Sequence, residues 1–259
     1  MTQERTEKEV LIIIPAYNER DNIEKLISHL RSPEITKIAD ILVMDDASTD
    51  GTGRVINKKN VAVVTHVFNL GYGSGLQLGY KYAIRRGYRY VIQMDADGQH
   101  DPVNVLRIYE KLKTADQTGS YPDIVLGSRF MEGSTPYKMS WLRKAAIRMF
   151  SHLVRWVTGI RINDPTSGLQ GLSRRTILYY SKYNGFDDRH PDANMIIQML
   201  LLGFRIQETP AVMHQRQGGV GMHHGLKTAI YMFRMGLSIL AVLIRIKILK
   251  LETGKLDDI

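Results

Sequence analysis

Short apolar runs that each stop abruptly at polar residues recur along the first half of the chain, and they restrict the fold more than any other feature. The run at 10–14 is continuous and rich in β-branched residues, as expected for a strand buried on both faces of a parallel sheet. Similar runs occupy residues 41–44, 61–67, 90–94 and 123–127. Helical patterns separate them, so the sequence predicts an α/β fold with a doubly wound, mainly parallel sheet flanked by helices.

The polar residues after the first four runs are expected to meet, because ligands in such sheets bind at the carboxyl ends of the strands. These clusters are residues 15–19, 45–50, 69–75 and 95–100. The glycines of the third cluster lack the Gly-x-Gly-x-x-Gly spacing, and no Gly-Lys-Ser/Thr occurs, which argues against a dinucleotide site and a P-loop. Close approach of backbone to a ligand and a plain turn at a helix entry both remain open for these glycines.

Asp95 and Asp97 stand at the end of the fourth run, where two unpaired carboxylates would be costly to bury. A divalent cation resolves this conflict, since Mg²⁺ takes a few protein oxygens, waters and phosphate oxygens, and Mn²⁺ suits similar ligands. Gly98 permits a sharp turn that would bring Gln99 or His100 toward the same ion. The alternative is a polar turn that caps the helix that follows.

The second half of the chain contains a basic stretch with both tryptophans, at 137–160. A helix of this kind can lie in a membrane interface, and a core helix with a solvated basic face is the alternative. The residues concerned are Trp141, Trp156, Lys144, Arg148 and Arg155.

The C-terminal segment holds an apolar run near 235–244, roughly half the ~20 residues that a spanning helix needs. We therefore predict no transmembrane helix but a C-terminal amphipathic helical segment, 223–259, after a domain at 1–222. This segment is expected to bind a membrane surface or a partner chain, with packing against the core as the alternative.

Composition adds two limits. The net charge of +9 favours an anionic partner, which could be nucleic acid, anionic lipid or a phosphorylated substrate. The absence of cysteine excludes disulfides and thiolate metal sites. The first nine residues are polar and do not form the apolar core of a signal peptide.

Taken together, five ordered motifs resemble those of family 2 glycosyltransferases of the GT-A fold, and in particular the dolichol- and polyprenyl-phosphate sugar synthases. The motifs are Pro-Ala-Tyr-Asn-Glu at 15–19, Asp-Asp-Ala-Ser-Thr-Asp-Gly-Thr at 45–52, Asn-Leu-Gly at 69–71, Asp-Ala-Asp-Gly-Gln-His at 95–100 and Gly-Ser-Arg at 127–129. The resemblance is strong over about the first 130 residues and looser beyond them.

The resemblance implies an inverting transfer of a hexose, with glucose expected, from a UDP-sugar to a polyprenyl phosphate, with Mg²⁺ or Mn²⁺ as cofactor. It also implies a peripheral protein at the cytoplasmic face of the membrane. Base and ribose would be held by Pro15, Tyr17, Glu19, Met44 and Asp46. Nucleotide and metal would be held by Asp95, Ala96 and Asp97, with Gln99 as a further metal ligand. Arg129 would face the diphosphate or donor sugar, and Arg216 the phosphates.

Asp164, with Ser167 and Gly168, resembles the Asp-x-x-Ser-Gly element near the reacting centre of the family. A phosphate acceptor needs no strong base, whereas a sugar hydroxyl does, and Asp164 or Asp192 would then serve. Two departures concern phosphate contacts, because Met222 stands where the family often has Lys and residues 169–170 are Leu-Gln in place of Phe-Arg.

The partners predicted are therefore a nucleotide sugar, a polyprenyl phosphate and an anionic membrane surface, with no nucleic acid and with self-association left open. Three other functions compete with this one: a transferase that extends a polysaccharide, a nucleotidyltransferase that releases pyrophosphate, and a non-enzymatic basic module. The basic module ranks lowest because it leaves the four polar clusters unexplained.

Overall fold

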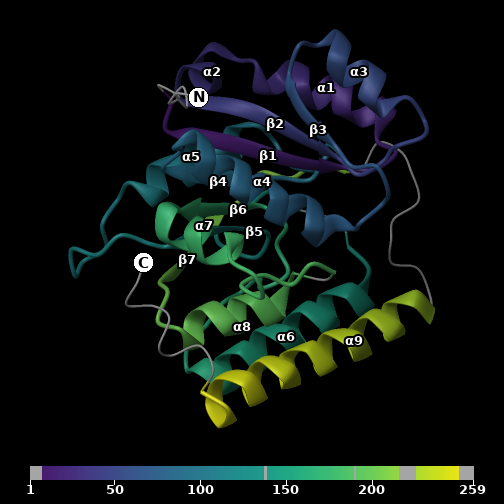
Figure 1. Cartoon of the computed structure of the whole chain (residues 1–259). Coiled ribbons are helices and arrows are strands. Elements are labelled where there is room, and N and C mark those ends of the chain that lie inside the picture. The colour runs from purple at the N-terminus through teal and green to yellow at the C-terminus, as the bar shows by residue number, and fades with distance from the viewer. Residues whose placement is uncertain (1–7, 137–138, 190, 216–225, 251–259) are drawn as a thin grey trace.

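The computed structural model describes residues 8–136, 139–189, 191–215 and 226–250. Within these residues, seven strands form one sheet in the order β3-β2-β1-β4-β6-β5-β7 (Figure 1). The strands are β1 Val10–Ala16, β2 Ala39–Asp45, β3 Ala62–Thr65, β4 Tyr90–Gln93, β5 Ile124–Ser128, β6 Gln170–Ser173 and β7 Ile206–Pro210. All pairings are parallel except those of β6, so the predicted mainly parallel α/β fold is confirmed.

Helices cover both faces of the sheet. They are α1 Arg20–Leu30, α2 Pro33–Ile38, α3 Thr52–Lys58, α4 Tyr72–Arg86, α5 Val103–Leu112, α6 Trp141–Thr158, α7 Arg174–Ser181, α8 Ala193–Leu201 and α9 Leu226–Leu243, which continues into a π-helical turn, η1 Ile244–Ile248. Alternate residues of β1 serve two separate cores, because side chains of a strand point to opposite faces. Leu11 and Ile13 belong to a core cluster that extends over α4 to α8 and α9, whereas Val10, Ile12 and Ile14 belong to a second cluster with residues of α1 and α5.

Strand β6 and two boundaries differ from the prediction. Residues 170–173 are Gln-Gly-Leu-Ser, which carry no strand pattern, and they form β6 because β4 and β5 hydrogen-bond to them from both sides. The strand predicted at 61–67 ends at Thr65 and lies at the edge of the sheet, so Val67 is exposed. Helix α4 already begins at Tyr72, which places Gly73 and Gly75 inside the helix.

Helix α9 packs against the body of the protein. Met235, Ile239 and Val242 are buried on one of its faces, and the helix contacts α8. The predicted domain boundary at 222/223 falls outside the described residues and stays a prediction. In the part of the chain that the structure describes, no helix is both long and apolar enough to cross a membrane.

Gly73 allows the first turn of α4 to touch the loop before α8. A Cβ built on Gly73 would lie 2.4 Å from the carbonyl oxygen of Asp187 and 2.6 Å from that of Asp188, and backbone atoms cannot move aside cheaply. We expect Gly73→Ala to lower the free energy of unfolding by about 1–3 kcal/mol, as overpacking does. Denaturant titration measures this change.

Gly236 provides the matched control within α9, because its added Cβ would meet nothing within 4 Å. Gly236→Ala should raise the free energy of unfolding by about 0.5–1 kcal/mol, since alanine loses less backbone entropy in a helix interior. Equal effects of the two substitutions would contradict a close contact at Gly73.

Candidate active site

The candidate site lies where the order of the strands reverses. From β1 the chain builds β2 and β3 on one side and then returns to place β4 on the other. In parallel sheets a crevice opens at such a point, beyond the carboxyl ends of the strands. The polar clusters after β1, β2 and β4 therefore meet at one edge of the sheet, as predicted.

The loops after β1 and β2 are hydrogen-bonded to each other. Asp50 accepts from the backbone N–H of Arg20 at 3.0 Å and from the Thr52 hydroxyl at 2.6 Å, and that hydroxyl accepts from the Glu19 N–H at 3.0 Å. Asn18 accepts from the Thr49 N–H at 2.9 Å. Burial raises the pKa of Asp50, but hydrogen bonds from Thr52 and Arg20 outweigh it and lower the pKa overall. These motif residues thus fix the two loops.

Asp46 holds the loop after β3. Its carboxylate accepts from the N–H groups of Leu70 and Gly71, each at 2.8 Å, and lies 2.7 Å from Nδ1 of His66. The side chain is buried, which explains why the Asn-Leu-Gly motif accompanies the Asp-Asp motif. Contact of Asp46 with a ribose stays a prediction.

The other residues predicted to hold base and ribose differ in exposure. Tyr17 is half exposed at the edge of the sheet, and Pro15 and Glu19 are intermediate. The Met44 side chain packs in the core beside Leu76, so it does not line the surface of the site.

Asp95 contacts a tyrosine and a histidine at the site. Its Oδ1 accepts from the Tyr72 hydroxyl at 3.0 Å, and its Oδ2 lies 3.8 Å from Nε2 of His100. Burial raises the pKa of Asp95, but the His100 contact, the Tyr72 hydrogen bond and the charge of Arg129 outweigh it and lower the pKa overall. Burial and the charge of Asp95 raise the pKa of Tyr72 well above its usual value. Tyr72 therefore keeps its proton, and Asp95 remains an anion.

The turn at 164–168 approaches Asp95 through a glycine. A Cβ on Gly168 would lie 2.7 Å from Asp95 Oδ2, so no larger residue fits without displacement. The Gly168 carbonyl accepts from the Gln93 amide at 3.2 Å, and Gln93 in turn accepts from the buried Tyr80 hydroxyl. The close approach to Asp95 explains the glycine of the Ser-Gly sequence in physical terms.

Asp97 and Gln99 follow in the sharp turn that Gly98 permits, where φ is 72°. Asp97 accepts from the Gln99 N–H at 3.1 Å, and the Gln99 carbonyl accepts from the His214 N–H at 2.7 Å. The latter bond ties this turn to the chain just before residue 216. Ala96 is buried between the two acids.

The donor set fits an open metal site rather than a closed one. Among the described residues, no group of three or more His, Cys, Asp or Glu side chains could hold a metal ion. Asp95 and Asp97 supply the hard anionic oxygens that Mg²⁺ and Mn²⁺ prefer, and such ions commonly complete their shells with water and phosphate oxygens. A diphosphate substrate would supply the missing ligands.

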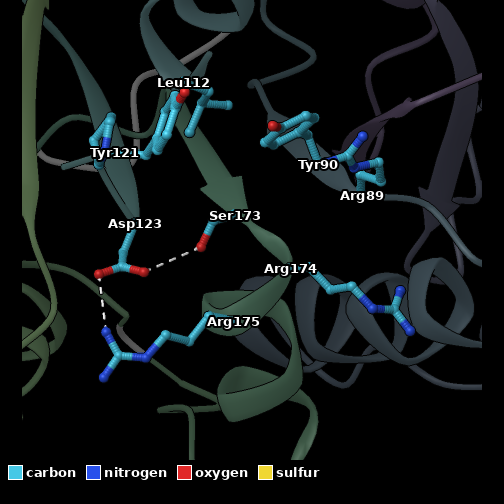
Figure 2. Close-up of a pocket in the computed structure, with 9 residues that line it drawn as sticks. Arg89, Tyr90, Leu112, Tyr121, Asp123, Ser173, Arg174 and Arg175 are labelled. Atoms are coloured by element: carbon cyan, nitrogen blue, oxygen red, sulfur yellow. Dashed lines mark hydrogen bonds and ion pairs between the residues drawn. The ribbon is translucent and has the colours of Figure 1, made fainter. Parts of the chain in front are cut away.

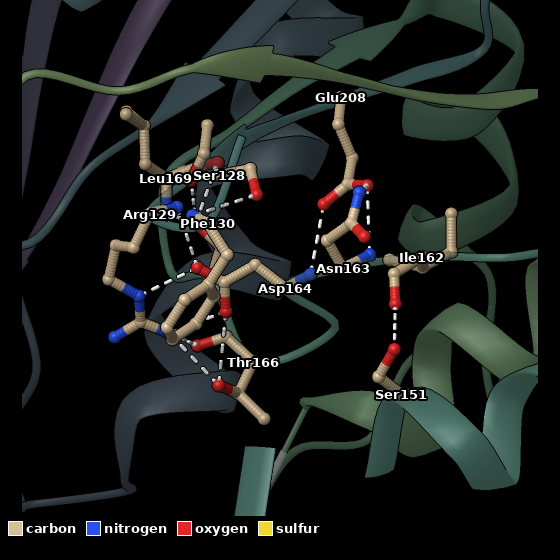
Figure 3. Close-up of polar contacts among 12 residues, drawn as sticks. Ser128, Arg129, Phe130, Ser151, Ile162, Asn163, Asp164, Thr166, Leu169 and Glu208 are labelled. Carbon is tan, nitrogen blue, oxygen red and sulfur yellow. Dashed lines mark hydrogen bonds and ion pairs between the residues drawn. The ribbon is translucent and has the colours of Figure 1, made fainter. Parts of the chain in front are cut away.

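Arg129 and Asp164 form a buried ion pair (Figure 3). The charge of Arg129 also acts on Asp95. Arg129 Nε donates to Asp164 Oδ2 at 2.7 Å, and Nη2 donates to Oδ1 at 2.6 Å. Nη2 also donates to the hydroxyl and the carbonyl of Thr166, at 3.0 and 3.2 Å. The Asp164 side chain is fully buried and that of Arg129 is 7% exposed.

This geometry argues against the role of general base predicted for Asp164. A general base must reach its substrate, and Asp164 has both oxygens on Arg129 and no exposed surface. The Arg129 guanidinium donates to the 164–166 turn, and its predicted contact with the diphosphate or donor sugar stays a prediction. The two residues therefore brace this turn against β5.

Glu208, in β7, also supports the turn that begins at Asp164. It was not identified from the sequence. Its carboxylate accepts from the N–H groups of Asn163 and Asp164, at 2.8 and 2.9 Å, and from the Asn163 amide at 2.7 Å (Figure 3). An acidic residue within a strand was the only signal in the sequence, and it did not indicate a partner.

Asp192 directly precedes α8 and lies close enough to Tyr72 for its charge to raise the pKa of that residue further. It therefore lies in the neighbourhood of Asp95, and its predicted role as a base stays a prediction. Arg216 and Met222 lie outside the described residues, so their predicted contacts with phosphate stay predictions.

A cavity of about 370 Å³ lies at the other end of the strands, near the amino-terminal ends of β4 and β5 (Figure 2). Its cations already have partners: Arg175 donates to Asp123 at 3.1 Å, Arg89 to Glu9 at 3.0 Å and Arg174 to the Tyr88 carbonyl at 3.1 Å. This cavity shares no residue with the candidate site.

The chain is similar to known proteins over most of its length. Residues 11–178 match the family described as Glycosyl transferase family 2. A polyprenol monophosphomannose synthase from Mycolicibacterium smegmatis is 28% identical over 241 residues, which cover 89% of this chain and 87% of the relative. An undecaprenyl-phosphate mannosyltransferase from Micrococcus luteus is 32% identical over 223 residues, which cover 81% of this chain and 85% of the relative.

Solved structures share the fold. Glucosyl-3-phosphoglycerate synthase from Mycobacterium tuberculosis, in complex with Mn²⁺, UDP-glucose and phosphoglyceric acid, has a TM-score of 0.65 at 19% identity. The match covers 92% of this chain and 79% of that one. The shared architecture is that of the GT-A glycosyltransferases.

Proposed function

The chain belongs to glycosyl transferase family 2, and from that premise we propose that it transfers a hexose from a nucleoside-diphosphate sugar to a polyprenyl phosphate. The observation that carries the proposal is the ionised, partly exposed Asp95, followed by Asp97, at the strand-order reversal. The acceptor is supported by the two relatives named above, whose names specify polyprenol and undecaprenyl phosphate.

For the donor, a UDP-hexose with glucose remains the specific proposal, and solved structures of the same fold hold UDP-glucose and Mn²⁺. Mannose is the second candidate, because both relatives are named for it. We also propose that the reaction takes place at the cytoplasmic face of a membrane, where the lipid acceptor would present its phosphate.

In the proposed reaction an oxygen of the acceptor phosphate attacks the anomeric carbon, the bond from that carbon to the diphosphate breaks, and the configuration inverts. Asp95 and Asp97 would hold Mg²⁺ or Mn²⁺, which supplies Lewis-acid neutralisation of the departing diphosphate when bound. Tyr72 orients the Asp95 carboxylate by its hydrogen bond. Arg129, Asp164 and Glu208 position the 164–168 turn against it.

The acceptor phosphate is already a nucleophile and needs no strong base. A sugar hydroxyl acceptor would need one, and Asp192 is then the accessible candidate, because Asp164 is fully buried. Acceptor chemistry therefore separates the proposed function from polysaccharide extension.

A transfer assay tests the proposal. Purified protein, radiolabelled UDP-glucose or GDP-mannose, Mn²⁺ and vesicles that contain undecaprenyl phosphate should give label in the organic phase, in a form released by mild acid. Label that enters only soluble glycan would overturn the lipid acceptor, and release of pyrophosphate in place of nucleoside diphosphate would overturn glycosyl transfer.

Thermal stability gives a second test of the same site. We expect a nucleoside diphosphate to raise the melting temperature only when Mn²⁺ is also present, because Asp95 and Asp97 would hold the phosphates through the ion. At a ligand concentration 100 times the Kd, the added stability is about 2.7 kcal/mol. A panel of UDP, GDP and ADP, each with and without Mn²⁺, measures it and identifies the base.

A further inference from the structure

Helices α6 and α9 present large apolar side chains to solvent. Trp141 and Trp156 of α6 are 79% and 82% exposed, and Met149 is exposed between them. They recur at helical spacing, so they share one face of α6. Burial of two tryptophans is a large source of free energy in proteins, and isolated domains rarely leave both so open.

Helix α9 and its π-helical turn η1 are apolar on two sides. Met235, Ile239, Val242 and Ile246 are buried, whereas the opposite side is exposed. That outer side consists of Phe233, Leu237, Leu240, Ile244 and Ile248, with Phe233 at 69% and Ile248 at 70% exposure. A helix with apolar residues on two opposite sides normally has both sides covered. The outer faces of α6 and α9 together are called here the α6–α9 surface.

The positive charge of the protein is concentrated in the segments that contain this surface. Residues 133–163 and 209–251 hold twelve Lys and Arg and no Asp or Glu. The rest of the chain holds 23 Lys and Arg against 26 Asp and Glu, so without these two segments the protein would be slightly acidic. On α6, the exposed cations Lys144, Arg148 and Arg155 flank the tryptophans.

The α6–α9 surface has a defined place in the fold. Helices α6, α8 and α9 form a layer at the end of the molecule opposite α1, α2 and α3 (Figure 1). The carboxyl-terminal end of α6 is hydrogen-bonded to η1, since Lys247 donates to the Val157 carbonyl at 3.4 Å. The amino-terminal ends of α6 and α9 point to the same side as the carboxyl ends of β1 and β2, which border the candidate active site (Figure 1).

We infer that the α6–α9 surface binds an anionic lipid bilayer, with α6 and α9 lying in the plane of its interface. Tryptophan and basic residues beside an apolar helical face match the headgroup and acyl boundary of such a membrane. A second copy of the chain is a less favourable partner for this surface, because a symmetric contact would bring the cations of the two copies together and they would repel each other. The sheet edge with the candidate site would then lie beside the headgroups.

Tryptophan fluorescence tests the inference without any substitution. Both tryptophans of the protein lie on α6, so their emission reports on this surface alone. Addition of vesicles that contain phosphatidylglycerol should shift the emission to shorter wavelength, and brominated lipids should quench it. Unchanged emission with these vesicles would overturn the inference.

Charge reversal supplies the matched comparison. Each cation near an anionic surface contributes about 1 kcal/mol, or about fivefold in partitioning. The variant Lys144→Glu/Arg148→Glu/Arg155→Glu should therefore lose about a hundredfold or more in vesicle flotation. The control reverses three exposed lysines on the opposite helices, Lys25→Glu/Lys37→Glu/Lys58→Glu, with the same change in net charge.

The two variants show whether vesicle binding depends on the cations of α6 or only on the net charge of the protein. Flotation that survives in the control but not in the α6 variant supports the inference, and equal loss in both overturns it. A dimer in light scattering that the α6 variant dissociates, together with no flotation of the wild type, would assign the surface to a second copy. Vesicle binding needs no sugar donor, so it can succeed or fail independently of the proposed transferase activity.

Discussion

The Asp95→Asn variant is expected to transfer hexose at least about a hundredfold more slowly than the wild-type protein, the scale on which single electrostatic contributors act in active sites. Asparagine keeps an oxygen that can accept from Tyr72 but removes the negative charge that would hold the cation. Because the Asp95 side chain is partly exposed, the free energy of unfolding should change by less than about 1 kcal/mol.

Initial rates at saturating donor and increasing Mn²⁺ measure the effect. The variant should also lose the Mn²⁺-dependent stabilisation by nucleoside diphosphate that the wild type shows. Asp21→Asn, an exposed acid on α1, is the control and should leave both quantities unchanged. A rate within threefold of the wild type, with the same Mn²⁺ dependence, would place the metal elsewhere.

The Asp164→Ala variant is expected to lose about 3–5 kcal/mol of unfolding free energy, the usual cost of removing one partner of a buried ion pair. The Arg129 guanidinium, which is 7% exposed, would keep its charge without the carboxylate that neutralises it. The N–H of Arg129 would also lose its acceptor, which lies at 3.0 Å. Urea titration followed by circular dichroism measures the loss.

Removal of an acid from an exposed ion pair gives a reference for this loss of unfolding free energy. Glu24 lies 3.0 Å from Lys59 on the surface, and Glu24→Ala should cost less than about 1 kcal/mol. If Asp164 were instead a general base, its replacement would leave a stable protein with little activity. A stability loss below 1 kcal/mol for Asp164→Ala would therefore contradict the bracing role.

Local sequence patterns were sufficient for the parts of the fold that depend on neighbours along the chain. The β-branched run of β1 and the helical stripe of α1 each specify their element within about ten residues. The carboxyl ends of parallel strands must share an edge, so the meeting of the Pro-Ala-Tyr-Asn-Glu and Asp-Asp motifs also followed from the sequence. The Gly98 turn was predictable for the same local reason.

The contacts that complete the site depend on residues far apart in the chain, and only the tertiary structure revealed them. Strand β6 exists because β4 and β5 hydrogen-bond to it, not because Gln-Gly-Leu-Ser favours extended backbone. Glu208 reaches Asp164 across 44 positions, and Arg129 reaches it across 35. An aspartate can act as an exposed base or as a buried partner of an arginine. Its surroundings in three dimensions decide between these roles, and they cannot be inferred from the residue type alone.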